Sequence, residues 1–328
     1  MSFQNNVSIV MTVKNEEENI SMILDSFLKQ TYKFHEIVIN DNGSDDRTIN
    51  VIKEYQKIDA RIKLVESKSQ SIGRGRNTAI KHSSGDILAI MDAGIYPQKD
   101  WLEKVVSPLL KNSDLDIVWG NIVFDTKSRI IPSTSLSMGL VFLTKYSEAS
   151  RKGKNVPSTA FRRKVWENMN GFPEIDVPIE DLLLISKVSK KGLKVMKVHD
   201  AIAYYFKYPT TYNEVFNKWM VSSFSAFIIK KSERGFFGQL YRFSFSFLFC
   251  TSLIFIDIRL VVVAILFLIG FFMNKYKKNS ELGKKIIQHP NLLITSINLF
   301  FILNLARFIG IVKALKFKLS GKTIHFEL

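Results

Sequence analysis

Short apolar runs alternate with amphipathic segments through the first 124 residues of the chain. The runs have the length and composition of buried strands, and the segments between them repeat apolar residues every three or four positions, as helices do. The predicted strands are Val7–Val13, Glu36–Asn40, Ile62–Glu66, Ile87–Asp92 and Ile117–Phe124. The predicted helices are Glu17–Leu28, Arg47–Tyr55, Arg74–His82 and Lys99–Leu110. This alternation is typical of an α/β fold with a mostly parallel sheet.

The pattern becomes irregular after residue 124. The stretch from Asp125 to Pro157 is polar, serine-rich and weakly periodic, which favours a lid or an acceptor-facing segment over a sheet element. From Tyr212 to Lys230, apolar residues return at helical spacing with lysines outside the apolar stripe, which predicts a helix lying in a membrane interface. The same spacing fits an amphipathic helix packed on the rest of the protein equally well.

Three apolar runs follow near the end of the chain, at Phe243–Ile256, Leu260–Met273 and Leu292–Leu305. Each has 14 residues, whereas a helix that crosses a bilayer needs about 20. Extension of the first two runs predicts a hairpin that turns at Asp257-Ile258-Arg259. Because lysines follow both the second and the third run, the positive-inside rule predicts that the third run lies in the interface or re-enters instead of crossing. A soluble helical domain with a large core is the alternative.

Composition and charge narrow the class of protein. The single cysteine, Cys250, excludes a disulfide framework or a Cys-based metal site within the 328 residues. The formal net charge is +16, and residues 235–328 hold 12 Lys or Arg against 3 Asp or Glu. Basic residues among long apolar runs favour an anionic membrane surface as a partner. The sequence has no basic helix or aromatic platform of the kind that binds nucleic acid, so we expect no such partner.

Polar clusters stand directly after the predicted strands. Lys14-Asn15-Glu16 follows the first strand, Asp41-Asn42-Gly43-Ser44 the second, and Asp92-Ala93-Gly94 the fourth, while Arg76-Asn77 opens a predicted helix. Ligands of open parallel sheets bind at the carboxyl ends of the strands, so these clusters predict one shared pocket of the kind that holds a nucleotide. We interpret Gly73-Arg74-Gly75 as a flexible loop beside it, because the third glycine of a dinucleotide fingerprint is absent at Thr78.

These motifs, in this order, resemble the nucleotide-sugar-binding half of the family 2 inverting glycosyltransferases. Gly171-Phe172-Pro173-Glu174 resembles the family's Gly-Phe-Asp-Glu turn, and Ile179-Glu180-Asp181-Leu182 resembles its Glu-Asp catalytic stretch. The resemblance covers roughly the first two thirds of the chain. It implies the Rossmann-like A-type fold of the nucleotide-diphospho-sugar transferases, a mixed and mostly parallel sheet flanked by helices, followed here by C-terminal hydrophobic helices. The domains we expect are residues 1–208 (catalytic), 209–234 (interface helix) and 235–328 (membrane-associated helices).

The resemblance implies a role for each site residue. Asp181 matches the catalytic base, and Glu180 beside it could hold a neighbouring hydroxyl or raise the pKa of Asp181. The two acids also suit the first turn of a helix, where they are favourable to its dipole. Arg76 matches an arginine near the base of the donor. The residues that match the donor site are Lys14, Asn15, Glu16, Asp41, Asn42, Arg76 and Asp92.

The main departure from the family concerns the metal. Enzymes of this fold usually hold Mg²⁺ or Mn²⁺ with an Asp-x-Asp motif, and Gly94 stands here at the position of the last Asp. A cation bound mostly by the donor's phosphates needs only one or two protein carboxylates. The sequence therefore predicts a weakly held divalent cation on Asp92, with His199 or Asp200 as a further candidate ligand.

The expected function is transfer of a hexose, with inversion, from a nucleoside-diphosphate sugar to a lipid-linked or polysaccharide acceptor in cell-surface glycan biosynthesis. The first ten residues lack the pattern of a signal peptide, so we expect a cytoplasmic catalytic domain at the cell membrane. Two alternatives stay open. One is a polyprenyl-phosphate sugar synthase, whose acceptor needs no base, and the other is a non-catalytic sugar-nucleotide-binding subunit of an envelope assembly complex.

Overall fold

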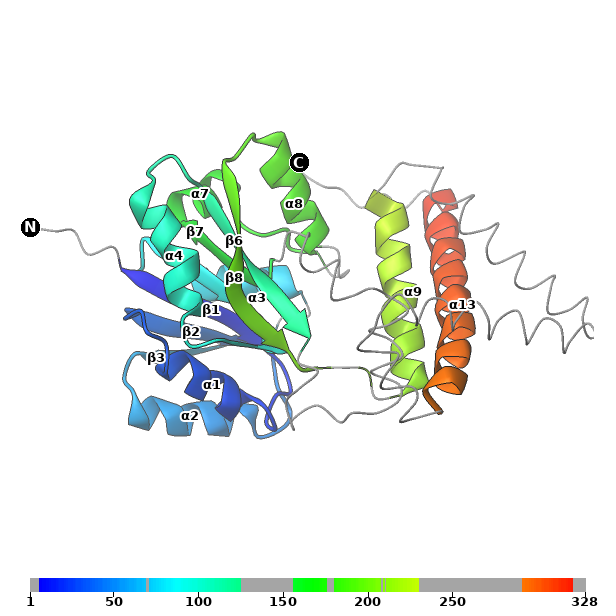
Figure 1. Ribbon diagram of the computed structural model, residues 1–328, viewed down its shortest axis with the longest axis horizontal. Coiled ribbons are helices and arrows are strands. Elements are labelled where there is room, and N and C mark those ends of the chain that lie inside the picture. Colours follow the sequence, from blue (N-terminus) through cyan, green and yellow to red (C-terminus); the bar gives the residue numbers. More distant parts are fainter. Residues whose placement is uncertain are drawn as a thin grey trace, which may run out of the picture. The chain divides into compact units, whose positions relative to one another are not determined.

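The computed structural model describes residues 6–68, 71–124, 156–175, 180–207, 209, 211–229 and 291–320. The chain divides into two compact units. The first comprises Met1–Ile131, Ser147–Lys207 and Phe326–Leu328, and the second comprises Pro132–Tyr146 and Tyr208–His325. Figure 1 labels helices and strands of both units.

An eight-stranded mixed sheet forms the centre of the first unit, in the order β3-β2-β1-β4-β7-β6-β8-β5 (Figure 1). The strands β1 to β4 pair in parallel, β7 is antiparallel to both of its neighbours, β6 and β8 are parallel, and β5 is antiparallel to β8. The strands are β1 (Val7–Val13), β2 (Glu36–Asp41), β3 (Ile62–Glu66), β4 (Ile87–Met91), β5 (Ile95–Pro97), β6 (Ile117–Phe124), β7 (Ser158–Arg162) and β8 (Val195–Tyr205).

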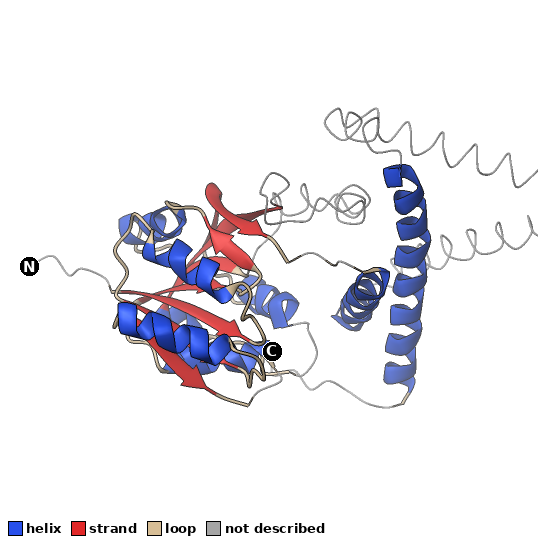
Figure 2. Ribbon diagram, turned by 90° about the horizontal axis from the view of Figure 1, so that it is seen from below, coloured by secondary structure: helices blue, strands red, loops and turns tan. Residues whose placement is uncertain are grey.

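Helices lie on both faces of this sheet (Figure 2). Those of the first unit are α1 (Ile20–Leu28), α2 (Thr48–Ile58), α3 (Ile72–Lys81), α4 (Trp101–Lys111), α7 (Arg163–Asn168) and α8 (Glu180–Lys190). One buried cluster joins α3, α7 and α8 to the sheet, and the buried residues of α1 and α4 are absent from it. We infer that α1 and α4 cover the opposite face.

The apolar runs form strands because both faces of the sheet are covered. Val10 of β1 belongs to the cluster with α3, α7 and α8, whereas its neighbours Ile9 and Met11 are fully buried outside it. Side chains alternate between the two faces of a strand, so a run that is apolar at every position fits only a strand packed on both sides. The burial of β4 is complete in the same way.

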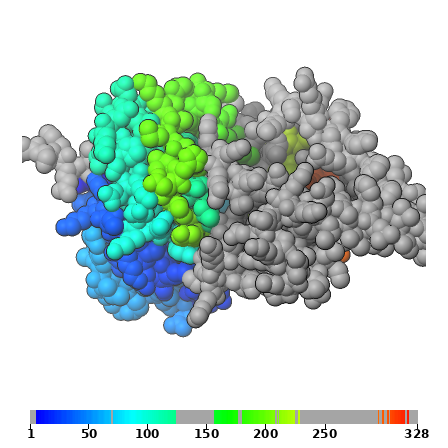
Figure 3. All heavy atoms as spheres, viewed as in Figure 1, coloured from blue at the N-terminus to red at the C-terminus, as the bar shows by residue number. Residues whose placement is uncertain are grey.

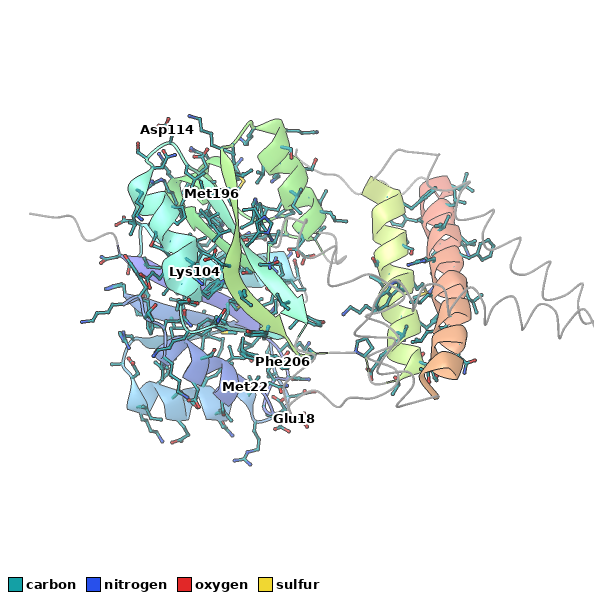
Figure 4. The ribbon with its side chains drawn as sticks, viewed as in Figure 1. Glu18, Met22, Lys104, Asp114, Met196 and Phe206 are labelled. Carbon is teal, nitrogen blue, oxygen red and sulfur yellow. The ribbon has the colours of Figure 1, made fainter. Side chains whose placement is uncertain are left out.

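Helix α4 and the strands β6 and β8 lie side by side on the face shown in Figure 3. Lys104 of α4, labelled in Figure 4, forms ion pairs with Asp100, at 2.8 Å, and with Asp200 of β8, at 3.4 Å. These ion pairs lie at the edge of the contact between α4 and the sheet. The inner part of this contact is apolar, with Trp101 and Val105 fully buried.

The second unit contains the helices α9 (Tyr212–Ile229) and α13 (Asn291–Leu319), which pack against each other. Val215 of α9 is buried with Leu299 and Leu303 of α13. Gly310 permits close contact of the helices, because a side chain there would overlap the backbone oxygen of Met220. No helix in the part of the chain that the structure describes is both long and apolar enough to cross a membrane.

The structure corrects several sequence-based predictions. Gly73-Arg74-Gly75 is the first turn of α3 and not a loop. Helix α1 begins at Ile20 and not at Glu17, because residues 15–17 bond to the loop after β2 instead. The third apolar run is part of the longer helix α13. The stretch from 125 to 155, both other apolar runs and their hairpin turn lie outside the described residues.

Candidate functional site

The site lies where the strand order of the sheet reverses. From β1 the chain goes to β2 and β3 on one side, whereas β4 lies on the other side of β1. In open α/β sheets, ligands bind in a crevice at the carboxyl ends of the strands at such a point. The loop that begins at Lys14 and the loop that begins at Asp92 flank this crevice. Glu18 and Phe206 lie at the same end of the sheet in Figure 4.

A buried arginine is the centre of the site. The Arg76 side chain is 1% exposed, and its two terminal nitrogens donate to acids from two different elements. Nη2 donates to Asp92, after β4, at 2.7 Å, and Nη1 donates to Asp181, in the first turn of α8, at 2.8 Å. Glu180 is 3.8 Å from Nη1, and the ring of Phe172 lies under the guanidinium, 5.4 Å from its central carbon. Three acids therefore surround one permanent positive charge.

This cluster has three acids and one guanidinium, and the pKa values of Glu180 and Asp181 are raised. Burial, the neighbouring Asp181 and, less strongly, Asp92 raise the pKa of Glu180 to about 7. Burial also raises the pKa of Asp181 above its usual range, although Arg76 opposes the shift. One guanidinium offsets only one of three negative charges, so a proton on Glu180 is the least costly way to reduce the excess.

Helix α3 also holds the turn that precedes the acids. Asn77 uses its whole amide for this: its nitrogen donates to Phe172 O and to Glu174 Oε1, both at 2.9 Å. Its oxygen accepts from Phe172 N and from the indole nitrogen of Trp166. A side chain at Gly73 would overlap the carbonyl oxygen of Pro173, so glycine is needed there for this close approach. Arg76 and Asn77 thus fix two neighbouring parts of the same site.

The loops after β1 and β2 are joined by hydrogen bonds. Asn15, at a positive φ of 53°, donates from its backbone to Ser44 Oγ and accepts from the backbone of Asp45. Asp41 is 1% exposed, and its Oδ1 accepts from the backbone nitrogens of Gly43 and Ser44. Asp41 therefore holds its own loop in this structure.

Asn42 and Lys14 complete the predicted donor residues. The amide oxygen of Asn42 accepts from Asn40, at 2.6 Å, and from Ser67. A side chain at Gly75 would lie 2.7 Å from this oxygen, so α3 packs directly on it. Lys14 is exposed.

Glu16 makes a contact that the sequence did not indicate. It is 6% exposed, and its Oε1 accepts from Lys207, just after β8, at 2.6 Å. Burial raises the pKa of Glu16 above its usual value, and the bond from Lys207 opposes the shift. The contact could not be predicted because it depends on the pairing of β8 with β5, which places the end of β8 beside the loop after β4.

The described residues offer little to a divalent cation. Asp92 has one oxygen on Arg76, its side chain is 30% exposed, and Gly94 supplies no ligand. His199 is exposed and lies six residues before Tyr205, which pairs with Ile95. His199 lies in a bulge of β8 between Lys197 and Ile202, and the regular segment from Ile202 to Tyr205 alone spans about 10 Å between this bulge and the strand end beside Ile95. No cluster of three His, Cys, Asp or Glu able to bind a metal occurs among the described residues. A cation would depend on Asp92 and on the donor's own phosphates.

The sequence of the first unit matches a known family. Residues 8–168 match the family described as Glycosyl transferase family 2. Glycosyltransferase AglE of Haloferax volcanii is 30% identical over 202 residues, which are 60% of this chain and 65% of AglE. The glucosyltransferase WfgD of Escherichia coli, UDP-Glc:alpha-D-GlcNAc-diphosphoundecaprenol beta-1,3-glucosyltransferase, is 34% identical over 126 residues, which are 38% of this chain and 49% of WfgD. The chain spans less than two thirds of the length of either relative.

Two solved structures share the fold. One is the mannosyltransferase PcManGT of Pyrobaculum calidifontis, in complex with GDP-Man and Mn²⁺. It matches with a TM-score of 0.57 at 18% identity, and the match covers 96% of this chain and 88% of the PcManGT chain. Residues 1–349 of Staphylococcus aureus TarS, in complex with UDP-GlcNAc, have a TM-score of 0.50 at 18% identity and cover 98% and 94%. Residues 8–168 thus match the model of glycosyltransferase family 2, and the chain has the mixed α/β sheet of these solved glycosyltransferases.

Proposed function

We propose that this chain, through its family 2 domain, moves a hexose from a nucleoside-diphosphate sugar to a lipid-linked or polysaccharide acceptor with inversion. One observation carries the proposal: Arg76 gathers Asp92 and Asp181 at the crevice where ligands of such sheets bind. The acids come from two different parts of the fold: Asp92 follows β4, and Asp181 is in the first turn of α8. This arrangement offers one acid to the donor and another to the acceptor.

The chemistry assigned to Asp181 is that of a general base. The acceptor hydroxyl attacks the anomeric carbon while the nucleoside diphosphate leaves from the opposite side, so one displacement inverts the configuration. Asp181 takes the proton of that hydroxyl. Its side chain is 34% exposed although Arg76 holds one of its oxygens, so an acceptor can reach the carboxylate. Burial raises the pKa of Asp181, which makes its carboxylate a stronger base than that of an ordinary aspartate.

A divalent cation would supply positive charge to the leaving diphosphate. In this chain Asp92 would hold it together with the phosphates, and PcManGT contains Mn²⁺ with its donor. With Gly94 in place of a second carboxylate, we expect chelator-stripped protein to regain activity with Mn²⁺ but at higher concentrations than relatives with both acids need.

The acceptor and the location are proposed on separate grounds. WfgD acts on a diphosphoundecaprenol-linked sugar, which supports a lipid-linked acceptor for this chain too. The basic residues among the apolar runs of residues 235–328 support a place at the cell membrane, with the catalytic domain in the cytoplasm and a role in cell-surface glycan synthesis.

The test is a panel of UDP-, GDP- and dTDP-hexoses offered to the purified full chain with Mn²⁺ and bacterial lipid extract. We expect release of one nucleoside diphosphate above background and an inverted product by NMR. Transfer only to polyprenyl phosphate, undiminished in Asp181→Asn, would favour the polyprenyl-phosphate sugar synthase. Donor binding without turnover of any sugar would favour the non-catalytic subunit.

A further inference from the structure

The position of Arg76 suggests a role different from contact with the donor. Only 1% of its side chain is exposed, and both terminal nitrogens are already engaged with acids, at 2.7 and 2.8 Å. The ring of Phe172 lies under the guanidinium plane. A donor in the crevice would meet the acids that Arg76 holds before it met Arg76 itself.

The two bonds join parts of the fold that lie far apart in the sequence, and they add a polar link to the apolar cluster that α8 shares with the sheet. Asp92 follows the central strand β4, whereas Asp181 belongs to α8, which follows the turn held by Asn77. A guanidinium is planar and rigid, so its two nitrogens set the separation of the carboxylates that they bind. An ammonium group would attract both acids without the same geometric control.

The surrounding charge makes this restraint necessary. Asp92, Glu180 and Asp181 would repel one another if Arg76 were neutral, and Asp181 has exposed surface toward which it could turn. Burial alone would lower the pKa of Arg76, but the three acids raise it above its ordinary value, so the guanidinium stays charged.

We propose that Arg76 is a positioning residue. It holds the base Asp181 at a fixed place relative to Asp92, and so places it where an acceptor hydroxyl attacks the sugar of a donor bound on Asp92, without itself contacting the donor's nucleotide. The inference rests on the proposed function and assigns a specific task within it.

A double-mutant cycle tests the inference, with transfer rates and nucleotide affinity measured on the purified full chain. Arg76→Gln alone should lower kcat about 100-fold, because a misplaced base contributes little. In an Asp181→Asn background the same change should lower kcat less than about threefold, since there is no base left to position. The Kd of UDP or GDP, by calorimetry, should rise by the same small factor in both backgrounds.

Arg74→Gln is the matched control. It removes a cation two residues away on the same helix, where the ion pair with Glu174 is exposed, and we expect less than a twofold change in kcat. If Arg76→Gln does not fold, Arg76→Lys replaces it in the same cycle, with an expected loss of about tenfold that again disappears in Asp181→Asn.

Two outcomes would overturn the inference and are distinct from failure of the proposed function. One is an equal loss of kcat in both backgrounds. The other is a nucleotide Kd raised tenfold or more by Arg76→Gln with kcat retained, which would assign Arg76 to the donor. A parent chain that turns over no donor would instead contradict the proposed function.

Discussion

At the scale of single residues, surroundings decide what each acid does. Glu36, at the start of β2, is 1% exposed, yet bonds from Lys63, Ser84 and Ser8 outweigh the effect of burial and lower its pKa to about 2. Glu180 is almost as buried but faces other acids, and its pKa rises to about 7. The surroundings of Glu36 therefore favour its ionised form, whereas those of Glu180 favour its protonated form, although both residues are glutamates.

Asp181→Asn is predicted to keep donor binding and to lower transfer by a factor of about 100 or more, the usual contribution of a positioned base. The amide still accepts from Arg76 but cannot take a proton. Steady-state kinetics with the best donor, together with calorimetry of the nucleotide, would measure the two effects. Transfer at the parent rate would refute the assignment of the base.

Glu180→Gln is predicted to stabilise the protein at neutral and alkaline pH. An acid whose folded pKa lies above its unfolded value of 4.5 costs stability as the pH rises from about 4.5 through about 7, because the folded state then loses a proton it held more tightly. Glutamine removes this cost, on the order of 1–3 kcal/mol at pH 8 and near zero at pH 4. Urea midpoints at both pH values measure it, and an equal change at both would count against the raised pKa.

At the scale of elements, helix α3 is shaped to approach its neighbours closely. A side chain at Gly75 would lie 2.5 Å from Thr12 Oγ1, and one at Gly73 would overlap the oxygen of Pro173. These glycines suggest a loop in the sequence, since glycine disfavours helices. The helix forms nevertheless, because Ser71 caps its first turn and Asn77 bonds to the turn at Phe172.

Gly73→Ala is predicted to reduce activity by about tenfold or more while costing about 1–3 kcal/mol of stability. The new methyl group must push away the turn at Pro173, and the catalytic acids follow that turn within ten residues. Thr78→Ala, farther along the same helix and away from the turn, is the control. The prediction would fail if Gly73→Ala had parent kinetics and parent thermal stability.

The predictions from the sequence were reliable where a run of apolar residues was long and its neighbours were local. The strands β1, β3 and β6 have the predicted limits. The strands β5, β7 and β8 are absent from the prediction, because each pairs only with strands distant in the sequence. The ion pair of Glu16 with Lys207 and those of Arg76 with its acids also join residues distant in the sequence, so the motifs identified the residues but not their contacts.

At the scale of the whole molecule, the site and the stabilising acid lie at opposite ends of the sheet. Glu36 opens β2 and pairs with Lys63 at 2.6 Å, whereas Asp92 and Asp181 lie at the carboxyl ends. Glu36→Gln is predicted to remove about 2–3 kcal/mol of stability at pH 7 and almost none at pH 2. The folded pKa is the lower one here, so the contribution is present above pH 4.5 and is lost as the pH falls toward 2.

Urea unfolding across pH 2–7, followed by tryptophan fluorescence, would measure the contribution of Glu36. Glu54→Gln, which removes an exposed partner of Lys57, is the control and should change little. A Glu36→Gln protein with the same acid-induced loss as the parent would contradict the role of this ion pair.

The full chain is predicted to sediment with membranes and to resist alkaline carbonate, because apolar runs and basic residues are interleaved over residues 235–328. Fractionation of cells and immunoblotting of the pellet measure this. Complete extraction of the protein by carbonate would contradict insertion into the membrane. Recovery of the protein in the first supernatant, before carbonate is added, would contradict any association with membranes.

The length of the strands has a consequence for engineering. Glu36 and Asp41 are the two ends of the six-residue strand β2 and lie about 17 Å apart, beyond the range within which substitutions usually influence one another. Variants at the amino end of the sheet should therefore combine with variants at the carboxyl end additively. A designer could first gain thermal tolerance around Glu36, and then use that reserve to accommodate destabilising changes of donor or acceptor specificity around Arg76.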